Sequence, residues 1–180
     1  MNSIDLVREF HARFKQRNCD APSIDSPIVN DLRIALLTEE VDELHDALRA
    51  GDPVAVLDAL TDIQYVLDGS YLSLGFAHLK DAALAEVHRS NMSKLGADGE
   101  PVYLPGGKVT KGPNYRPPNL ERIVRRDRER REQQAACSHA WENINEARPA
   151  FQHCIRCDSF RAMPKDTTTR PSPSRGRGSR

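Results

Sequence analysis

The chain has 180 residues, of which 38% are hydrophobic, enough for one compact domain with an appendage. No apolar run approaches the roughly 20 residues that a membrane-spanning helix needs, which excludes an integral membrane protein of the helical type. The N-terminus does not resemble a signal peptide, so we expect a cytoplasmic protein.

The net charge is zero but unevenly distributed. Residues 1–100 carry 18 acidic and 9 basic side chains, whereas residues 101–180 carry 8 and 17. An acidic first half can concentrate divalent cations, and a basic second half can meet phosphates or nucleic acid.

Four helices are predicted in the first half. Apolar residues at helical spacing predict the first over about 4–14. Serine or aspartate followed by proline begins the next two, over about 27–50 and 53–74, with Gly51 between them. The fourth covers about 79–94.

The second half changes in character. We divide the chain into a helical domain over 1–120 with an arm at 95–118, which includes a short hairpin, and a charged helical linker at 121–136. A Cys/His module follows at 137–161, and the basic, low-complexity tail at 162–180 is expected to be disordered.

Five carboxylates lie at helical spacing on the second and third helices. Glu39, Glu40 and Glu43 share one face of the second helix, and Asp58 and Asp62 share one face of the third. The one-residue turn makes the two helices antiparallel neighbours, so the carboxylates should face one another. Such oxygen ligands suit Mg²⁺ or Mn²⁺. The alternative is a solvated acidic face.

The pattern resembles the MazG-like and phosphoribosyl-ATP pyrophosphohydrolase-like all-α superfamily, which carries E-E-x-x-E on one helix and a second acidic pair on the next. Residues 86–94 and 107–115 resemble further motifs of the superfamily, and the similarity spans about residues 5–120. One departure is Ala59, where the usual acid is absent and Asp58 precedes it. The resemblance implies a four-helix-bundle nucleoside triphosphate pyrophosphohydrolase core.

The resemblance also implies roles for the carboxylates. Glu40, Glu43, Asp58 and Asp62 would hold two or three Mg²⁺ or Mn²⁺ ions on the triphosphate, while a water attacks the α-phosphorus. Glu39 would orient or deprotonate that water, or act as a further ligand.

Several residues are candidates for contacts with the substrate phosphates or base. Asn91 and Lys94 lie three apart at a helix end, where C-terminal capping is the alternative role. The arm can close over the phosphates, with exchange between subunits as a structural alternative that is compatible with this role. For Arg33, the alternative is an ion pair with a carboxylate. The candidates are Arg33, Asn91, Lys94, Lys108, Lys111 and Tyr115.

The C-terminal module has the ligand spacing of a structural zinc site. Cys137 and His139 precede Cys154 and Cys157, giving C-x-H and C-x-x-C pairs. His153 is an alternative fourth ligand, and an unstructured tail with chance cysteines is the alternative for the whole module.

The preferred function is Mg-dependent hydrolysis of a nucleoside or deoxynucleoside triphosphate to monophosphate and pyrophosphate, with a purine such as dGTP or GTP as substrate. This would adjust the dNTP pool, in a phage or bacterial setting. The alternatives are the phosphoribosyl-ATP pyrophosphohydrolase of histidine biosynthesis and a nucleic-acid-binding zinc protein that uses the basic tail. We expect a homodimer or homotetramer.

Overall fold

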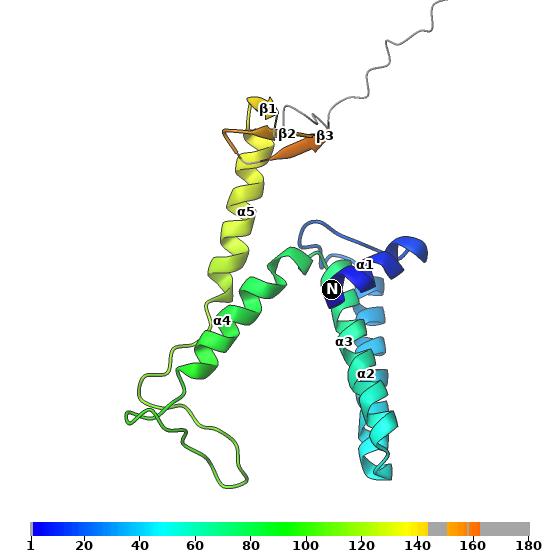
Figure 1. Ribbon diagram of the computed structural model, residues 1–180, viewed down its shortest axis with the longest axis vertical. Coiled ribbons are helices and arrows are strands. Elements are labelled where there is room, and N and C mark those ends of the chain that lie inside the picture. Colours follow the sequence, from blue (N-terminus) through cyan, green and yellow to red (C-terminus); the bar gives the residue numbers. More distant parts are fainter. Residues whose placement is uncertain (1, 144–150, 158, 163–180) are drawn as a thin grey trace, which may run out of the picture. The chain divides into compact units, whose positions relative to one another are not determined.

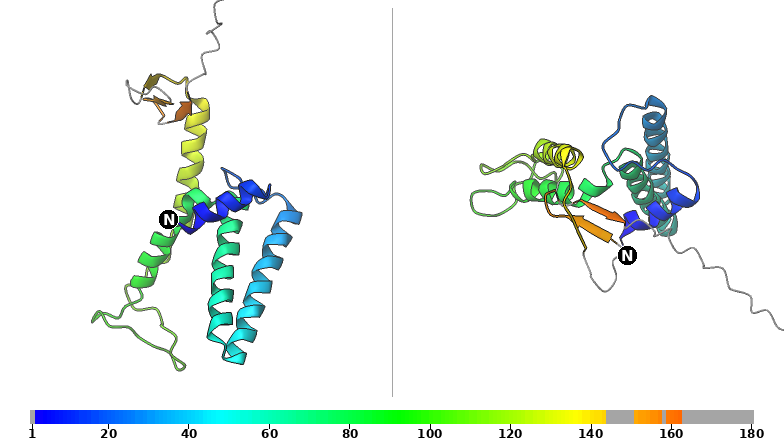
Figure 2. Two further views of the ribbon diagram at one scale, coloured as in Figure 1. Left: turned by 45° about the vertical axis from the view of Figure 1, so that its right-hand side comes forward. Right: turned by 90° about the horizontal axis from the view of Figure 1, so that it is seen from above.

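The computed structural model describes residues 2–143, 151–157 and 159–162. The chain divides into two compact units, Met1–Ile123 and Val124–Arg180. Figures 1 and 2 show the helices of the first unit and the small sheet of the second.

Three helices begin and end where local signals place them. They are α1 (Ser3–Arg13), α2 (Pro27–Ala50) and α3 (Pro53–Ser73). The Asp52 side chain caps α3 by accepting hydrogen bonds from two backbone N–H groups, and Gly51 ends α2 with a φ of 68°. Ser26 occupies the N-cap position of α2, but its side chain makes no capping hydrogen bond.

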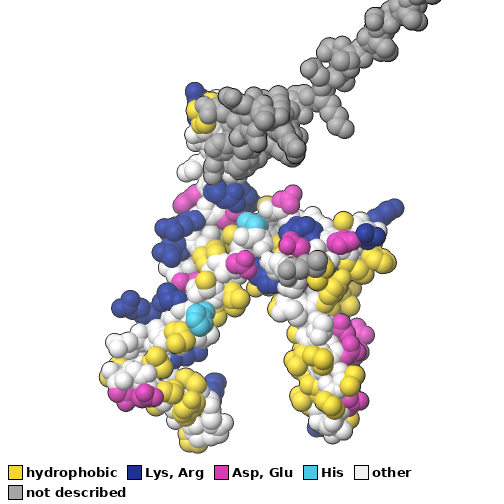
Figure 3. Space-filling model, viewed as in Figure 1, with side chains coloured by type: hydrophobic (Ala, Val, Ile, Leu, Met, Phe, Trp, Pro, Cys, Tyr) yellow, Lys and Arg dark blue, Asp and Glu magenta, His cyan; other side chains and the backbone are white. Residues whose placement is uncertain are grey.

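The core of the first unit lies where α1 crosses α3. Ile4, Val7 and Leu72 are buried there, with Tyr71 and Ala77 packed against them. The α2–α3 hairpin extends away from this core (Figure 1). Much of the apolar surface of the hairpin is exposed (Figure 3), as at Ile28, which is 83% exposed, and Val54, which is 75% exposed.

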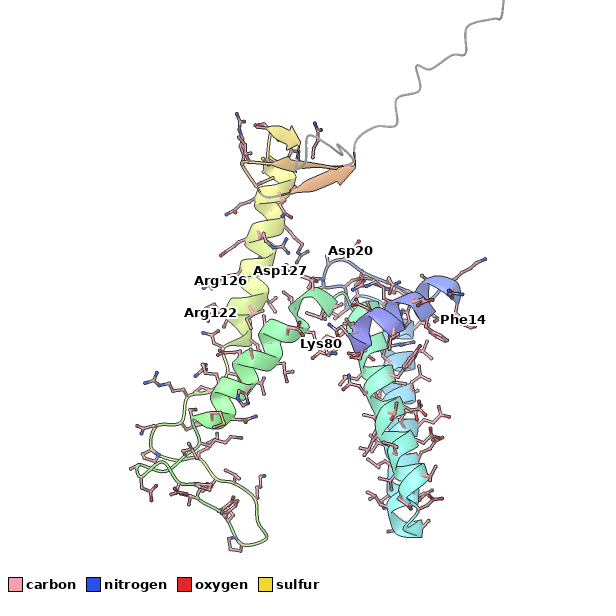
Figure 4. The ribbon with its side chains drawn as sticks, viewed as in Figure 1. Phe14, Asp20, Lys80, Arg122, Arg126 and Asp127 are labelled. Carbon is pink, nitrogen blue, oxygen red and sulfur yellow. The ribbon has the colours of Figure 1, made fainter. Side chains whose placement is uncertain are left out.

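The fourth helix is joined to α3 by the short 3-10 helix η1 (Ala77–Leu79), and α4 itself spans Lys80–Met92. Lys80, at the start of α4 (Figure 4), forms an ion pair with the fully buried Asp68 of α3. The most extensive helix contacts among the described residues are α2–α3 and α1–α3, whereas α4 mainly contacts η1. The unit is therefore all-α, and closure of its helices into a four-helix bundle stays a prediction.

The arm contains the predicted hairpin. Tyr103 and Val109 form an isolated antiparallel bridge, and the N–H of Leu104 donates to the carbonyl of Lys108 at 2.8 Å. The arm then returns to the end of α4, where the N–H of Gly112 donates to the carbonyl of Lys94 at 2.9 Å. These bonds give the arm a defined course along its own helix.

The second unit holds most of the charged helix and a small sheet. Helix α5 spans Leu120–Ala136, beginning just inside the first unit, and its first turn is capped by the Asn119 side chain, which accepts from the N–H of Arg122. Strands β1 (Trp141–Asn143), β2 (Phe151–Cys154) and β3 (Phe160–Ala162) form an antiparallel sheet in that order. The tail at 162–180 was predicted to be disordered; its first residue, Ala162, instead ends β3, and residues 163–180 lie outside the described residues.

Among the described helices, none combines the length and the apolar character that a membrane crossing requires.

Candidate active site

The five predicted carboxylates lie along the seam between α2 and α3. Glu40 and Asp62 are half-buried, whereas Glu39, Glu43 and Asp58 are exposed. The pKa of Glu40 is raised, first by burial and then by the negative charges of Asp62, Glu43, Glu39 and Asp58. Both helices therefore direct negative charge at one position.

This donor set is chemically suited to a hard divalent cation. Carboxylate oxygens are the protein ligands that Mg²⁺ and Mn²⁺ prefer, and a cation would relieve the repulsion felt by Glu40. Within the described part of the chain, the Cys/His group is the one set of three or more such residues whose donor atoms are already gathered. We expect the oxygens of exposed carboxylates to lie further apart, because their negative charges repel one another.

Arg33 lies on the same seam, two helical turns from Glu40, or about 10 Å along the helix. Its side chain is 9% exposed, and its Nε has no hydrogen-bond partner among the described residues. Burial lowers its pKa. Among the ion pairs of the described residues none joins Arg33 to a carboxylate, so the predicted alternative role has no support here.

A glycine makes room for this arginine. A Cβ at Gly69 of α3 would lie 3.0 Å from Nη1 of Arg33 and 3.1 Å from Nε2 of His11. The other ring nitrogen of His11, Nδ1, lies 3.0 Å from the carbonyl of Arg17. Burial lowers the pKa of His11 most strongly, the backbone hydrogen bond with Arg17 opposes this, and the charge of Arg33 lowers the pKa further. A neutral imidazole beside a buried guanidinium results.

The arginine also borders an apolar depression. Ile34 and Leu37 of α2 and Leu74, just after α3, line it together with Arg33. A buried cation at the edge of an apolar surface is suited to a ligand with a charged and a flat apolar part.

The other predicted phosphate-binding residues lie at the end of α4 and in the arm. Lys94 Nζ donates to Asn91 Oδ1 at 2.7 Å, and Lys111 Nζ lies 4.5 Å from the centre of the Tyr115 ring. Lys108 lies in the arm hairpin, opposite Leu104. No described hydrogen bond or ion pair joins this group to the carboxylates. The structure thus places the predicted site residues in two groups.

Two ion pairs that position these elements were missed in the sequence. One is Asp68 with Lys80, and the other is Glu86 with Arg89, whose closest N–O distance is 2.7 Å. Glu86 also accepts from the N–H of Asn119, and Arg89 donates to the carbonyl of Pro117, so this pair holds the arm on α4. Asp68 could have been recognised in the sequence as a buried ion-pair partner, because it is an acid within the largely apolar second half of α3.

The predicted zinc ligands come together in the second unit. Donor atoms of Cys137, His139, Cys154 and Cys157 all lie within 4.8 Å of one another.

Comparison with known families gives one match. Residues 7–91 match the model of the family described as phosphoribosyl-ATP pyrophosphohydrolase. The matched segment runs from α1 to near the end of α4 and contains all five carboxylates, Arg33 and Asn91. No curated protein matches the chain.

Proposed function

We propose that the protein cleaves a triphosphate-bearing nucleotide to the monophosphate and pyrophosphate, because residues 7–91 match a family model of the all-α nucleoside triphosphate pyrophosphohydrolase superfamily. The observation that carries the proposal is the seam of carboxylates, where Glu40 is subject to four other negative charges from two helices. A match to this superfamily together with five carboxylates along the seam supports an active hydrolase.

In the reaction, a water oxygen bonds to the α-phosphorus, the bond from that phosphorus to the bridging oxygen breaks, and pyrophosphate leaves with the bonding electrons. Glu40, Glu43, Asp58 and Asp62 would hold Mg²⁺ or Mn²⁺, which neutralises phosphate charge when bound. Glu39 is exposed beside them and either takes the proton from the attacking water or adds a further ligand.

Arg33 is suited to the remainder of the substrate. Its unpartnered Nε would donate to a sugar or base oxygen, or to a phosphate, and the adjoining apolar depression would accept the flat face of a nucleobase. Asn91, Lys94, Lys108, Lys111 and Tyr115 would contact the phosphates from the end of α4 and the arm.

The two groups of site residues lead us to propose a homodimer or homotetramer. The carboxylates and the arm group share no described hydrogen bond, and the α2–α3 hairpin exposes Val41, Leu48 and Leu57 by 52, 61 and 67%. A second copy would cover this apolar surface, complete the helical bundle and bring an arm to the carboxylates.

The substrate we favour is a purine nucleoside or deoxynucleoside triphosphate such as dGTP or GTP. Phosphoribosyl-ATP is the second candidate, because the matching family model carries that name. Both substrates present the same bond to the carboxylates, so the choice depends on Arg33 and its surroundings.

The test is pyrophosphate release with Mg²⁺ from dGTP, GTP, the other common triphosphates and phosphoribosyl-ATP. We expect turnover of at least one substrate, activity that EDTA removes, and loss of activity in Glu43→Gln. Absence of pyrophosphate release from every substrate with both Mg²⁺ and Mn²⁺ would contradict the proposed function.

A further inference from the structure

The second unit brings together two pairs of metal-ligating side chains. Cys137 follows α5 directly, with His139 two residues on; Cys154 ends β2, and Cys157 lies after it. Two backbone hydrogen bonds hold these segments together. The N–H of Ile155 donates to the carbonyl of Ala140 at 3.1 Å, and the N–H of Cys154 donates to the carbonyl of Ser159 at 2.8 Å. The backbone thus brings the C-x-H segment against the C-x-x-C turn.

The distances between donor atoms match those around a tetrahedral ion. The sulfurs of Cys137 and Cys154 are 3.7 Å apart, and Sγ of Cys157 lies 3.4 Å from Nδ1 of His139. Zinc with bonds of about 2.3 Å to sulfur and about 2.0 Å to nitrogen separates such pairs by about 3.8 Å and about 3.5 Å. All four donor atoms also lie within 4.8 Å of one another.

A disulfide does not account for the arrangement. All four cysteines of the chain are free, and 3.7 Å is much longer than the roughly 2.05 Å of a sulfur–sulfur bond. Three thiols and an imidazole around one point are instead a donor set typical of structural zinc.

We propose that Cys137, His139, Cys154 and Cys157 bind one Zn²⁺ in a closed structural site, a role separate from the proposed hydrolase activity. Four protein ligands fill the tetrahedral shell and leave no position for substrate. Cys154 has an exposed fraction of 0%, as expected for a ligand within the module rather than at a reactive surface.

The zinc would stabilise a unit that has little else to hold it. Its three strands have three or four residues each, too few to bury a core of useful size. Because Cys137 adjoins α5 and Cys154 ends the central strand, the ion would fasten the sheet to the end of the helix.

The structure places one histidine at the cluster. His139 has its Nδ1 beside the Cys157 sulfur, and its own backbone has a φ of 21°, an uncommon value for a residue other than glycine. We therefore assign His139 as the fourth ligand, and His153, whose side chain lies outside the described part of the chain, is the alternative that matched variants test.

The experiment uses the full chain purified under reducing conditions, with metal content measured by mass spectrometry and Co²⁺ substitution followed by absorption. We expect one Zn²⁺ per chain, and after substitution the d–d bands of tetrahedral cobalt with a thiolate-to-metal charge-transfer band. That band reports sulfur ligands, so it separates this site from any metal bound by the carboxylates.

Matched variants complete the test. Cys154→Ser should lose the zinc, whereas Cys19→Ser, which removes the one cysteine outside the cluster, should keep it. His139→Asn should weaken zinc binding at least about 100-fold while His153→Asn leaves it unchanged, and His139→Cys should restore it with an altered cobalt spectrum. Absence of zinc in reduced wild-type protein reconstituted with Zn²⁺ would overturn the site, and equal loss in Cys19→Ser or His153→Asn would overturn the ligand assignment.

Discussion

Two acidic side chains of the α2–α3 hairpin, Glu40 and Asp68, have opposite electrostatic surroundings. Glu40 is surrounded by other carboxylates, and burial together with their charge raises its pKa. Burial also opposes ionisation of Asp68, but hydrogen bonds from Lys80, Ser3 and Gln64 outweigh it and lower the pKa. Asp68 thus has its cation within the chain, whereas no ion pair among the described residues joins Glu40 or its neighbouring carboxylates to a basic side chain.

Glu40→Gln should abolish turnover with little effect on the fold. Loss of residues that only orient metal ligands costs about 10–100-fold, so loss of a ligand itself should cost at least about 100-fold in kcat/KM. The melting temperature without metal should stay equal or rise, because a repelling charge is removed. Asp46→Asn, which neutralises an exposed acid on the same helix, should retain activity. Full activity in Glu40→Gln would refute the metal site.

Asp68→Asn should destabilise the first unit by about 3 kcal/mol at pH 7, because Lys80 loses a buried partner. The folded pKa of Asp68 is lowered, so its stabilising contribution is complete above the unfolded pKa of about 3.9 and is lost as the pH falls through the folded value. The stability difference between wild type and variant should therefore narrow below about pH 4 in denaturation experiments. Asp81→Asn, at an exposed position, is the control, and a pH-independent difference would contradict the ionic role.

At the scale of whole elements, helix boundaries were predictable because their signals are local. The proline after Asp52, the cap that Asp52 forms and the left-handed glycine at 51 all lie within a few residues of the ends that they set. The sequence predicts a Cys/His module at 137–161 without its strands, because three-residue strands show no periodicity and their pairing depends on residues distant in sequence.

The identity of the buried residues was harder to predict than the positions of the helices. Phe14 and Leu32 belong to predicted apolar stripes, yet they are 61 and 46% exposed, because periodicity shows that a face is apolar without showing what covers it. The Asp68–Lys80 ion pair joins residues 12 apart on different helices, so no local sequence pattern predicts it. The cysteine and histidine spacing, by contrast, predicted the gathered ligand set, because each pair is short and rigid.

One of the contacts that hold the arm on α4 is a very close backbone approach at Gly112. A Cβ at Gly112 would lie 2.0 Å from the carbonyl oxygen of Leu95, and the backbone there cannot move aside as a side chain can. Gly112→Ala should therefore release the arm from α4, speed its cleavage in limited proteolysis and raise KM for the triphosphate several-fold. Circular dichroism should show the helices unchanged. If Gly112→Ala has the proteolysis rate and the KM of the wild type, the arm is not held through this contact.

At the scale of the molecule, the exposed hairpin predicts assembly. Light scattering at micromolar concentration should give a dimer or tetramer, since a single chain leaves apolar positions such as Leu57 uncovered. Leu57→Lys should shift the protein toward the monomer, whereas Gln133→Lys, which adds the same charge to an exposed position of α5, should not. A monomeric wild-type protein would contradict the proposed assembly.

The division of the chain predicts that hydrolysis and the zinc module are separable. All five carboxylates, Arg33 and the arm lie within Met1–Ile123, and the zinc ligands lie within Val124–Arg180. Deleting residues 135–180 should therefore leave kcat/KM within a few-fold of the full-length value while zinc content falls to zero.

The same deletion tests the alternative of a nucleic-acid-binding zinc protein. The deleted segment contains the arginine-rich C-terminus, and neutralisation of phosphates by such residues makes binding steeply dependent on salt. If nucleic acid is the true ligand, the truncated protein should lose a salt-sensitive affinity that the full chain possesses, and neither protein should release pyrophosphate. If instead a folded truncation loses hydrolysis that the full chain shows, the C-terminal unit must build part of the active site. Measuring kcat/KM, zinc content and nucleic-acid affinity on both proteins distinguishes these outcomes, because each hypothesis predicts that a different property is lost when the C-terminal unit is deleted.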